Sequence, residues 1–111
     1  MATVTTVRLT STGVTHIGEN HDRMCGFWLI QVSGTFSGTL KFRKKLPTDT
    51  VANASAYLFD VEEVQDYTVV DKATGVTAAG LYKAVVDGAS LVLDYTYTSG
   101  TCVVELLPML G

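Results

Sequence analysis

The residues that could do metal chemistry are gathered near the N-terminus. His16, His21, Asp22 and Cys25 lie within one ten-residue stretch, and imidazole, carboxylate and thiolate groups are all zinc ligands. Their spacing matches no zinc-binding pattern, and only one sulfur is available among them. We therefore expect no metal site and no cofactor.

The acidic and nucleophilic residues give an equally weak case for catalysis. Glu62 and Glu63 are adjacent, so in an extended chain they point to opposite faces and cannot act as a pair. Neither histidine belongs to a catalytic motif, and no serine occupies a G-x-S-x-G turn. The sequence predicts a protein that is not an enzyme.

Two tyrosines suggest glycan binding, because a row of exposed aromatic side chains on a sheet face can stack on sugars. Tyr95 and Tyr97 lie two residues apart, on one face of an extended segment. However, they continue the line of Leu91 and Leu93, which favours a place in the core or at its rim. Their exposure decides between the two interpretations.

The element that must position any site is the stretch from Gly26 to Lys45. Its even positions are mostly apolar, whereas the odd positions from Gln31 onward are polar, and this period of two is typical of β structure with one buried face. Gly34 and Gly38 interrupt the pattern. We therefore predict two antiparallel strands joined through the Gly34 to Gly38 region.

Other segments repeat the alternation and are separated by turn residues. The sequence Asp87-Gly88 predicts a two-residue hairpin, because both residues tolerate positive φ. Residues 52–64 could form a short helix, but a strand with Tyr57, Phe59 and Val61 on one face is the preferred interpretation. The other predicted strands cover residues 3–9, 14–17, 65–70, 81–86, 91–98 and 102–106.

These segments predict the fold class: an all-β protein, a single antiparallel β-sandwich of jelly-roll type with about eight or nine strands. The chain of 111 residues is expected to form one domain. Residues 1–25 form either an N-terminal arm or the first short strands, and residues 26–111 form the sandwich. The predicted core contains Trp28, Ile30, Val32, Phe36, Leu40, Phe42, Leu93, Val104 and Leu106.

Composition and charge exclude several partners. The formal net charge is −3, so we expect no nucleic acid partner, because such binding relies on many Lys or Arg residues. Residues 43–45 are the one basic cluster, and we expect it to be a solvated gatekeeper at a strand edge. No apolar run has the length of a membrane span or of a signal peptide, so we expect a soluble protein with no membrane partner.

The two cysteines, Cys25 and Cys102, are expected to be reduced. In a chain without an export signal, buried thiols are more common than a disulfide.

Apolar residues also occupy the face that a half-exposed strand leaves to solvent. Phe27 and Leu29 alternate with Trp28 and Ile30, and Val103 and Leu107 lie opposite Val104 and Leu106 along the last strand. Such residues indicate a second covered surface, and self-association as a cyclic homo-oligomer is the simplest cover, with a trimer as the first expectation. The candidate partner interface therefore contains Val4, Val7, Arg8, Phe27, Leu29, Val103 and Leu107.

Residues 27–107 resemble a recurring small β-sandwich of tailed-bacteriophage virion proteins. That family combines a Gly-Thr-Phe-x-Gly-Thr strand pair, a Gly-x-Tyr strand, a Gly-Ala turn and a final Ser-Gly-Thr-x-x-Val hairpin. An Arg that such families often carry in the penultimate strand is absent here, as is a Trp after the central pair. The matching positions are Gly34, Phe36, Gly38, Thr39, Gly80, Tyr82, Gly88, Ala89, Ser99, Gly100, Thr101 and Val104.

The resemblance implies a structural virion protein, most simply a capsid decoration or cement protein that stabilises the shell. Its partner would then be the major capsid protein, and its location the virion, assembled in the host cytoplasm. The alternative within the same family is a tail-associated module that binds a receptor or a carbohydrate.

Overall fold

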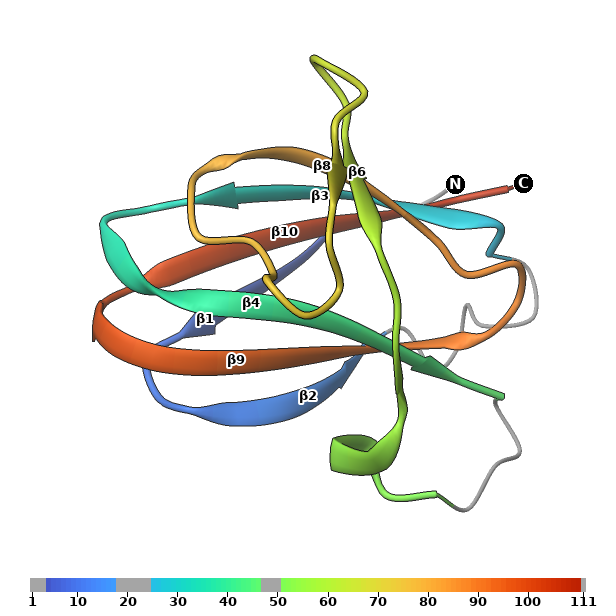
Figure 1. The fold of residues 1–111 in the computed structure, drawn as a ribbon, viewed down its shortest axis with the longest axis horizontal. Coiled ribbons are helices and arrows are strands. Elements are labelled where there is room, and N and C mark those ends of the chain that lie inside the picture. The colour runs from blue at the N-terminus through green and yellow to red at the C-terminus, as the bar shows by residue number, and fades with distance from the viewer. Residues whose placement is uncertain (1–3, 18–24, 47–50, 111) are drawn as a thin grey trace.

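The computed structural model describes residues 4–17, 25–46 and 51–110. Two antiparallel β-sheets pack face to face (Figure 1). Sheet A has the order β1 (Thr5–Leu9), β10 (Cys102–Met109), β3 (Phe27–Ser33), β8 (Gly80–Val85), β6 (Val61–Glu63) and β7 (Val69–Val70). Sheet B has the order β2 (Gly13–Ile17), β9 (Ser90–Gly100), β4 (Phe36–Lys45) and β5 (Tyr57–Leu58), and a 3-10 helix, η2, covers Asn53–Ser55.

The strand order is that of a jelly roll. With β6 and β7 set aside, β1-β10-β3-β8 faces β2-β9-β4-β5, which is the eight-strand double-sheet arrangement. The predicted all-β sandwich is confirmed. The described residues form ten strands rather than eight or nine, because β6 and β7 add a hairpin to the edge of sheet A.

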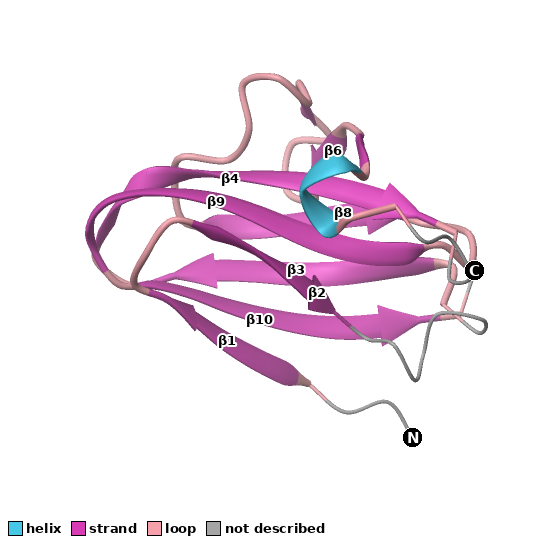
Figure 2. Cartoon of the chain, turned by 90° about the horizontal axis from the view of Figure 1, so that it is seen from below, coloured by secondary structure: helices cyan, strands magenta, loops and turns pink. Residues whose placement is uncertain are grey.

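Three of the connections that pass from one sheet to the other lie together at one end of the sandwich (left in Figures 1 and 2). These are β1–β2, β3–β4 and β9–β10. The predicted pairing of the two strands in the Gly26 to Lys45 stretch is therefore wrong, because β3 pairs with β10 and β8 whereas β4 pairs with β9 and β5. Their apolar faces meet across the core instead of lying side by side.

Two glycines make these sharp corners possible. Gly34 and Gly100 have φ angles of 94° and 77°, a region that side chains with a Cβ rarely enter. A Cβ on Gly34 would lie 2.5 Å from the Thr101 carbonyl oxygen, and one on Gly100 would overlap the Thr35 carbonyl oxygen. The Thr101 N–H donates to that same Thr35 oxygen over 2.9 Å, so a hydrogen bond joins the two corners.

The Asp87-Gly88 turn has the predicted backbone but not the predicted role. Both residues have positive φ, 49° and 90°. However, the turn joins β8 in sheet A to β9 in sheet B, so it is not a hairpin. Its amides donate to Gly26 O over 2.8 Å and to Cys25 O over 2.7 Å, so this turn also connects the two layers.

The core lies between the sheets and matches the prediction closely. Phe36 is half-buried and packs against the core cluster. The other predicted core residues are at most 2% exposed: Trp28, Ile30, Val32, Leu40, Phe42, Leu93, Val104 and Leu106.

The segment that follows β4 changes sheets, which the sequence did not indicate. Tyr57 belongs to β5 in sheet B and is 69% exposed, whereas Val61 begins β6 in sheet A and is 3% exposed. The predicted common face of Tyr57, Phe59 and Val61 is therefore wrong, because the chain crosses between layers within these few residues. The alternative helix is limited to η2.

The described part of the N-terminal segment forms strands of the sandwich, at Thr5–Leu9 and Gly13–Ile17. β1 pairs with β10, and β2 pairs with β9.

Replacing Gly100 with Ala should destabilise the protein strongly. The new Cβ meets backbone, which cannot move without opening the neighbouring corner. We expect a loss of at least about 3 kcal/mol in the free energy of unfolding, or failure to fold. Urea titration followed by circular dichroism measures this loss. Gly13→Ala is the matched control, since nothing lies within 4 Å of its Cβ position, and a loss as large as that of Gly100→Ala would contradict the corner argument.

Truncating Trp28 to Ala tests the core. Trp28 is 0% exposed, so the variant should lose about 3–5 kcal/mol of unfolding free energy in the same titration. A loss under about 1 kcal/mol would mean that the indole is a surface group.

Candidate interaction surface

The outward side of sheet A carries apolar residues in register across adjacent strands. Residues directly opposite each other in paired strands project to the same side of the sheet. One such row contains Leu107 on β10, Leu29 on β3 and Lys83 on β8. The neighbouring row contains Met109, Phe27 and Val85. These rows alternate with the buried row that contains Trp28, so they face away from the core.

We call Phe27, Leu29, Val85, Leu107 and Met109 the outer apolar face. Val85 is 41% exposed and the other four are half-buried. The outward side of an antiparallel sheet at the surface is ordinarily polar. A group of apolar side chains there is a candidate contact surface, whereas a single exposed one would need no explanation.

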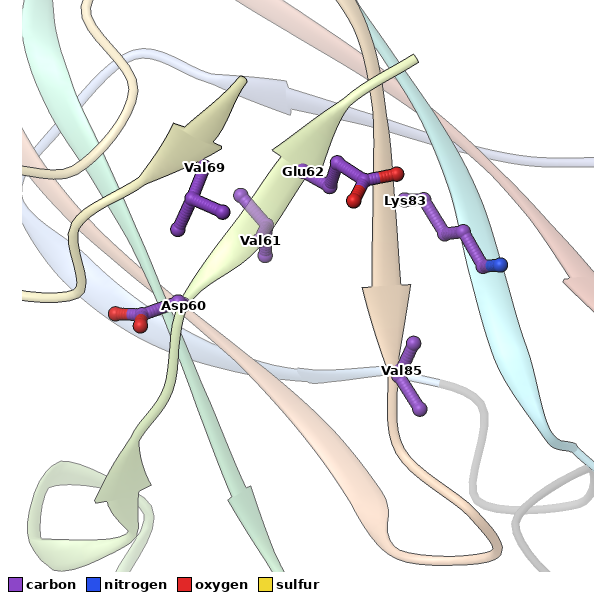
Figure 3. A pocket seen from close by; sticks show the side chains of 6 residues that line it. All are labelled: Asp60, Val61, Glu62, Val69, Lys83 and Val85. Carbon is purple, nitrogen blue, oxygen red and sulfur yellow. The ribbon is translucent and has the colours of Figure 1, made fainter. Parts of the chain in front are cut away.

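A lysine and an open pocket border this face. Lys83 Nζ lies 4.6 Å from the centroid of the Phe27 ring, a distance suited to a cation–π interaction. Figure 3 shows its amine pointing away from the Glu62 carboxylate on the adjacent strand β6. The pocket has a volume of about 280 Å³ and is lined by Asp60, Val61, Glu62, Val69, Lys83 and Val85.

The structure brings together most of the residues predicted for the interface. Phe27 and Leu29 lie beside Leu107, while Val103 and Arg8 form a row further along the same side of sheet A. The two remaining residues lie elsewhere.

Val7 pairs with Val104 and packs against the core cluster, on the inner side of sheet A. Val4 precedes β1 and is 50% exposed. Period-two parity explains why Val7 and Arg8 project to opposite sides of one strand.

The outward side of sheet B is partly covered by the chain itself. Val92 projects outward from β9, yet it is 0% exposed. Its neighbour Arg43 donates to Asp94 Oδ2 over 2.8 Å and to the Ala56 carbonyl oxygen over 2.7 Å. The arginine thus fastens the residues after η2 beside β4.

The neighbouring lysines also bind the chain's own carbonyl groups. Lys44 Nζ donates to Val85 O over 3.2 Å and lies 4.5 Å from the centroid of the Phe59 ring. Lys45 Nζ donates to Val51 O over 2.7 Å. The basic cluster therefore ties loop and sheets together, rather than standing solvated at an edge as the sequence suggested.

The two tyrosines considered for glycan binding do not form an exposed row. Tyr95 is 0% exposed, with its ring against Gly38 and its hydroxyl buried without a hydrogen-bond partner. Burial raises its pKa, and Cys102 and Tyr97 add to the shift. Tyr97 is 37% exposed. The most exposed tyrosines are two that the sequence did not suggest for glycan binding, Tyr57 at 69% and Tyr67 at 76%.

The described residues show neither a metal-binding cluster nor a helix that could span a membrane. Within residues 4–17, 25–46 and 51–110, no three His, Cys, Asp or Glu side chains gather as a possible metal site. His21 and Asp22, which the sequence analysis considered, lie outside these ranges. In the same ranges, no helix has the length and apolarity needed to cross a membrane.

Both cysteines are buried thiols in this structure. The Cys25 thiol donates to Phe27 O over 3.2 Å. Burial raises the pKa of Cys102 to about 11, which keeps its thiol protonated and unreactive at neutral pH.

The chain was compared with known proteins at three levels. A scan of protein-family models and searches of curated proteins and of solved structures found no match.

The Cys102 thiol predicts a pH dependence of stability. Its pKa is about 11 in the folded protein against 9.0 for the unperturbed group, so unfolding releases protons between these values. Its contribution to stability is complete below about pH 9 and is lost as the pH rises through about 11. Between a pKa of 9.0 and one of about 11 the loss should approach about 3 kcal/mol, at about 1.4 kcal/mol for each pKa unit.

Urea titrations of wild type and Cys102→Ala at several pH values between 8 and about 11 measure this contribution. Because Tyr82 and Tyr95 also have raised pKa values, the informative quantity is the difference between the two proteins. A difference that stays constant with pH would contradict the burial of a protonated thiol.

Proposed function

We propose that this chain is a non-enzymatic structural protein of a bacteriophage virion that decorates the capsid and stabilises the shell. Two surfaces of a well-packed jelly roll carry the proposal: the outer apolar face, which is suited to contacts between protein copies, and the exposed edges of β1 and β2, which are suited to a strand of the capsid. The residues of the outer apolar face offer no acid, base or nucleophile in an enclosed site.

The motif resemblance supports the virion part of the proposal. Gly34 and Gly100, two of the matching glycines, form the corners at which strands change sheets, and Gly88 forms the turn between β8 and β9. The resemblance therefore rests on residues that direct this fold. Jelly rolls recur in viral capsid proteins, and also in lectins.

The N-terminal edge of the sandwich offers a second contact, suited to the major capsid protein. β1 ends sheet A and β2 ends sheet B, so one side of the molecule presents the edges of two five-residue strands. The opposite edges are formed by β7 and β5, which have only two residues each. An exposed strand edge can pair with a strand of another protein. Val4 and Arg8 are exposed beside this edge.

Co-sedimentation with capsids of the phage that encodes the chain tests the proposal. Wild-type protein should bind saturably, and Arg8→Glu should bind about tenfold more weakly, because it reverses a charge beside the pairing edge. Lys72→Glu, an exposed charge reversal in the turn before β8, is the matched control and should bind as wild type. Substitutions are preferred to deletion of residues 2–17, since deletion would remove β1 and β2.

The second candidate is a tail-associated module that binds a receptor or a carbohydrate. The exposure of Tyr57 and Tyr67 favours it, because exposed aromatic rings can stack on sugars. Absence of capsid binding by the wild-type protein, together with saturable binding to a host glycan, would overturn the capsid proposal in favour of this one.

A further inference from the structure

We propose that the outer apolar face binds a second copy of this chain. The two sheets A would pack face to face about a two-fold axis that lies between them and is parallel to β3. The inference does not depend on capsid binding and can be tested with the isolated protein.

The position of β3 suggests this axis. In the order β1-β10-β3-β8-β6-β7, β3 has two strands on one side and, on the other, two strands and the two-residue β7. Phe27 and Leu29 project outward from β3. Rotation by 180° about this axis places β8 of one copy over β10 of the other. Val85 of one copy then lies opposite Met109 of the other, and Lys83 lies opposite Leu107. The apolar residues of each copy are then covered by those of the other.

Charge complementarity favours a second copy as the occupant. On the strands next to β3, β8 carries one outward cation, Lys83, and β10 carries one outward anion, Glu105. The next strands out add Glu62 on β6 and Arg8 on β1, which the same rotation also lays over each other's strands. The two-fold rotation brings each Lys83 near Glu105 of the other copy, because Glu105 lies two residues from Leu107 on the same strand. The pair of opposite charges forms twice, once on each side of the axis, as an isologous contact requires.

The available area fits a small, reversible contact. Five strands at about 4.8 Å spacing and seven residues at about 3.3 Å rise enclose a face of roughly 24 by 23 Å, of which β1 with five residues and β6 with three fill only a part. Each copy would bury at most about 550 Å², or about 1,100 Å² in total, which lies at the small end of protein–protein interfaces. A face-to-face contact of this kind closes as a dimer, whereas the trimer expected from the sequence would need two different patches.

Sedimentation velocity of the isolated protein tests the dimer. Wild type should be dimeric at about 100 μM, and Leu29→Glu should weaken association at least about a hundredfold, because it places a charge at the centre of the contact. Leu46→Glu makes the same change at a residue that is 67% exposed at the end of β4, and it should remain dimeric. A monomeric wild type, or equal weakening by both variants, would overturn the proposal.

A charge exchange tests the geometry without relying on the Leu29 variant to fold. Lys83→Glu and Glu105→Lys should each weaken self-association about tenfold, since each leaves like charges opposed. An equimolar mixture should restore wild-type affinity, because the mixed dimer regains both opposite pairs. Failure of the mixture to restore association would overturn the two-fold arrangement about β3.

Discussion

The structure depends on the corners at which the chain leaves one sheet and enters the other. Gly34 and Gly100 adopt positive φ there, and each leaves room for a backbone carbonyl of the neighbouring corner. A side chain at either position would push the two corners apart. Three connections between the sheets, β1–β2, β3–β4 and β9–β10, lie at this end. The corners therefore determine that β3 faces β4, and that β10 faces β9, across a common core.

The same folding leaves one apolar surface partly uncovered. Residues such as Trp28 and Leu93 are covered when the two sheets meet, but residues of opposite parity on β3 and β10 turn away from the partner sheet. On sheet B, the chain provides its own cover near Val92, with Arg43 holding the residues after η2. Phe27 and Leu29 on sheet A stay only half-buried, and the proposed contact between two copies rests on this difference between the sheets.

Period-two patterns predicted the fold class and the core well, because burial on one side of a strand constrains residue types strongly. They could not predict which strands pair. The alternation in β3 and β4 is equally compatible with a hairpin and with two facing sheets. The close approach of the Thr101 carbonyl oxygen to Gly34, which accompanies the change of sheet, is visible only in the folded structure. The outward direction of Leu29 and Leu107 could be predicted from their alternation with buried neighbours. The direction of Val7 could not be predicted, because the inner face of its strand could not be assigned from the sequence. The roles of Lys44 and Lys45 depend on carbonyl groups from distant segments, which no local pattern reveals.

The central claim is that the outward side of sheet A is a protein-contact surface. Methyl NMR spectra of the isolated protein over a dilution series test it most directly, because each methyl group reports on its own surroundings. The account predicts that the methyl signals of Leu29 and Leu107 shift with protein concentration, while those of Leu40 and Leu93, which are fully buried, stay constant. Signals of Leu29 and Leu107 that do not change over the whole series would contradict it.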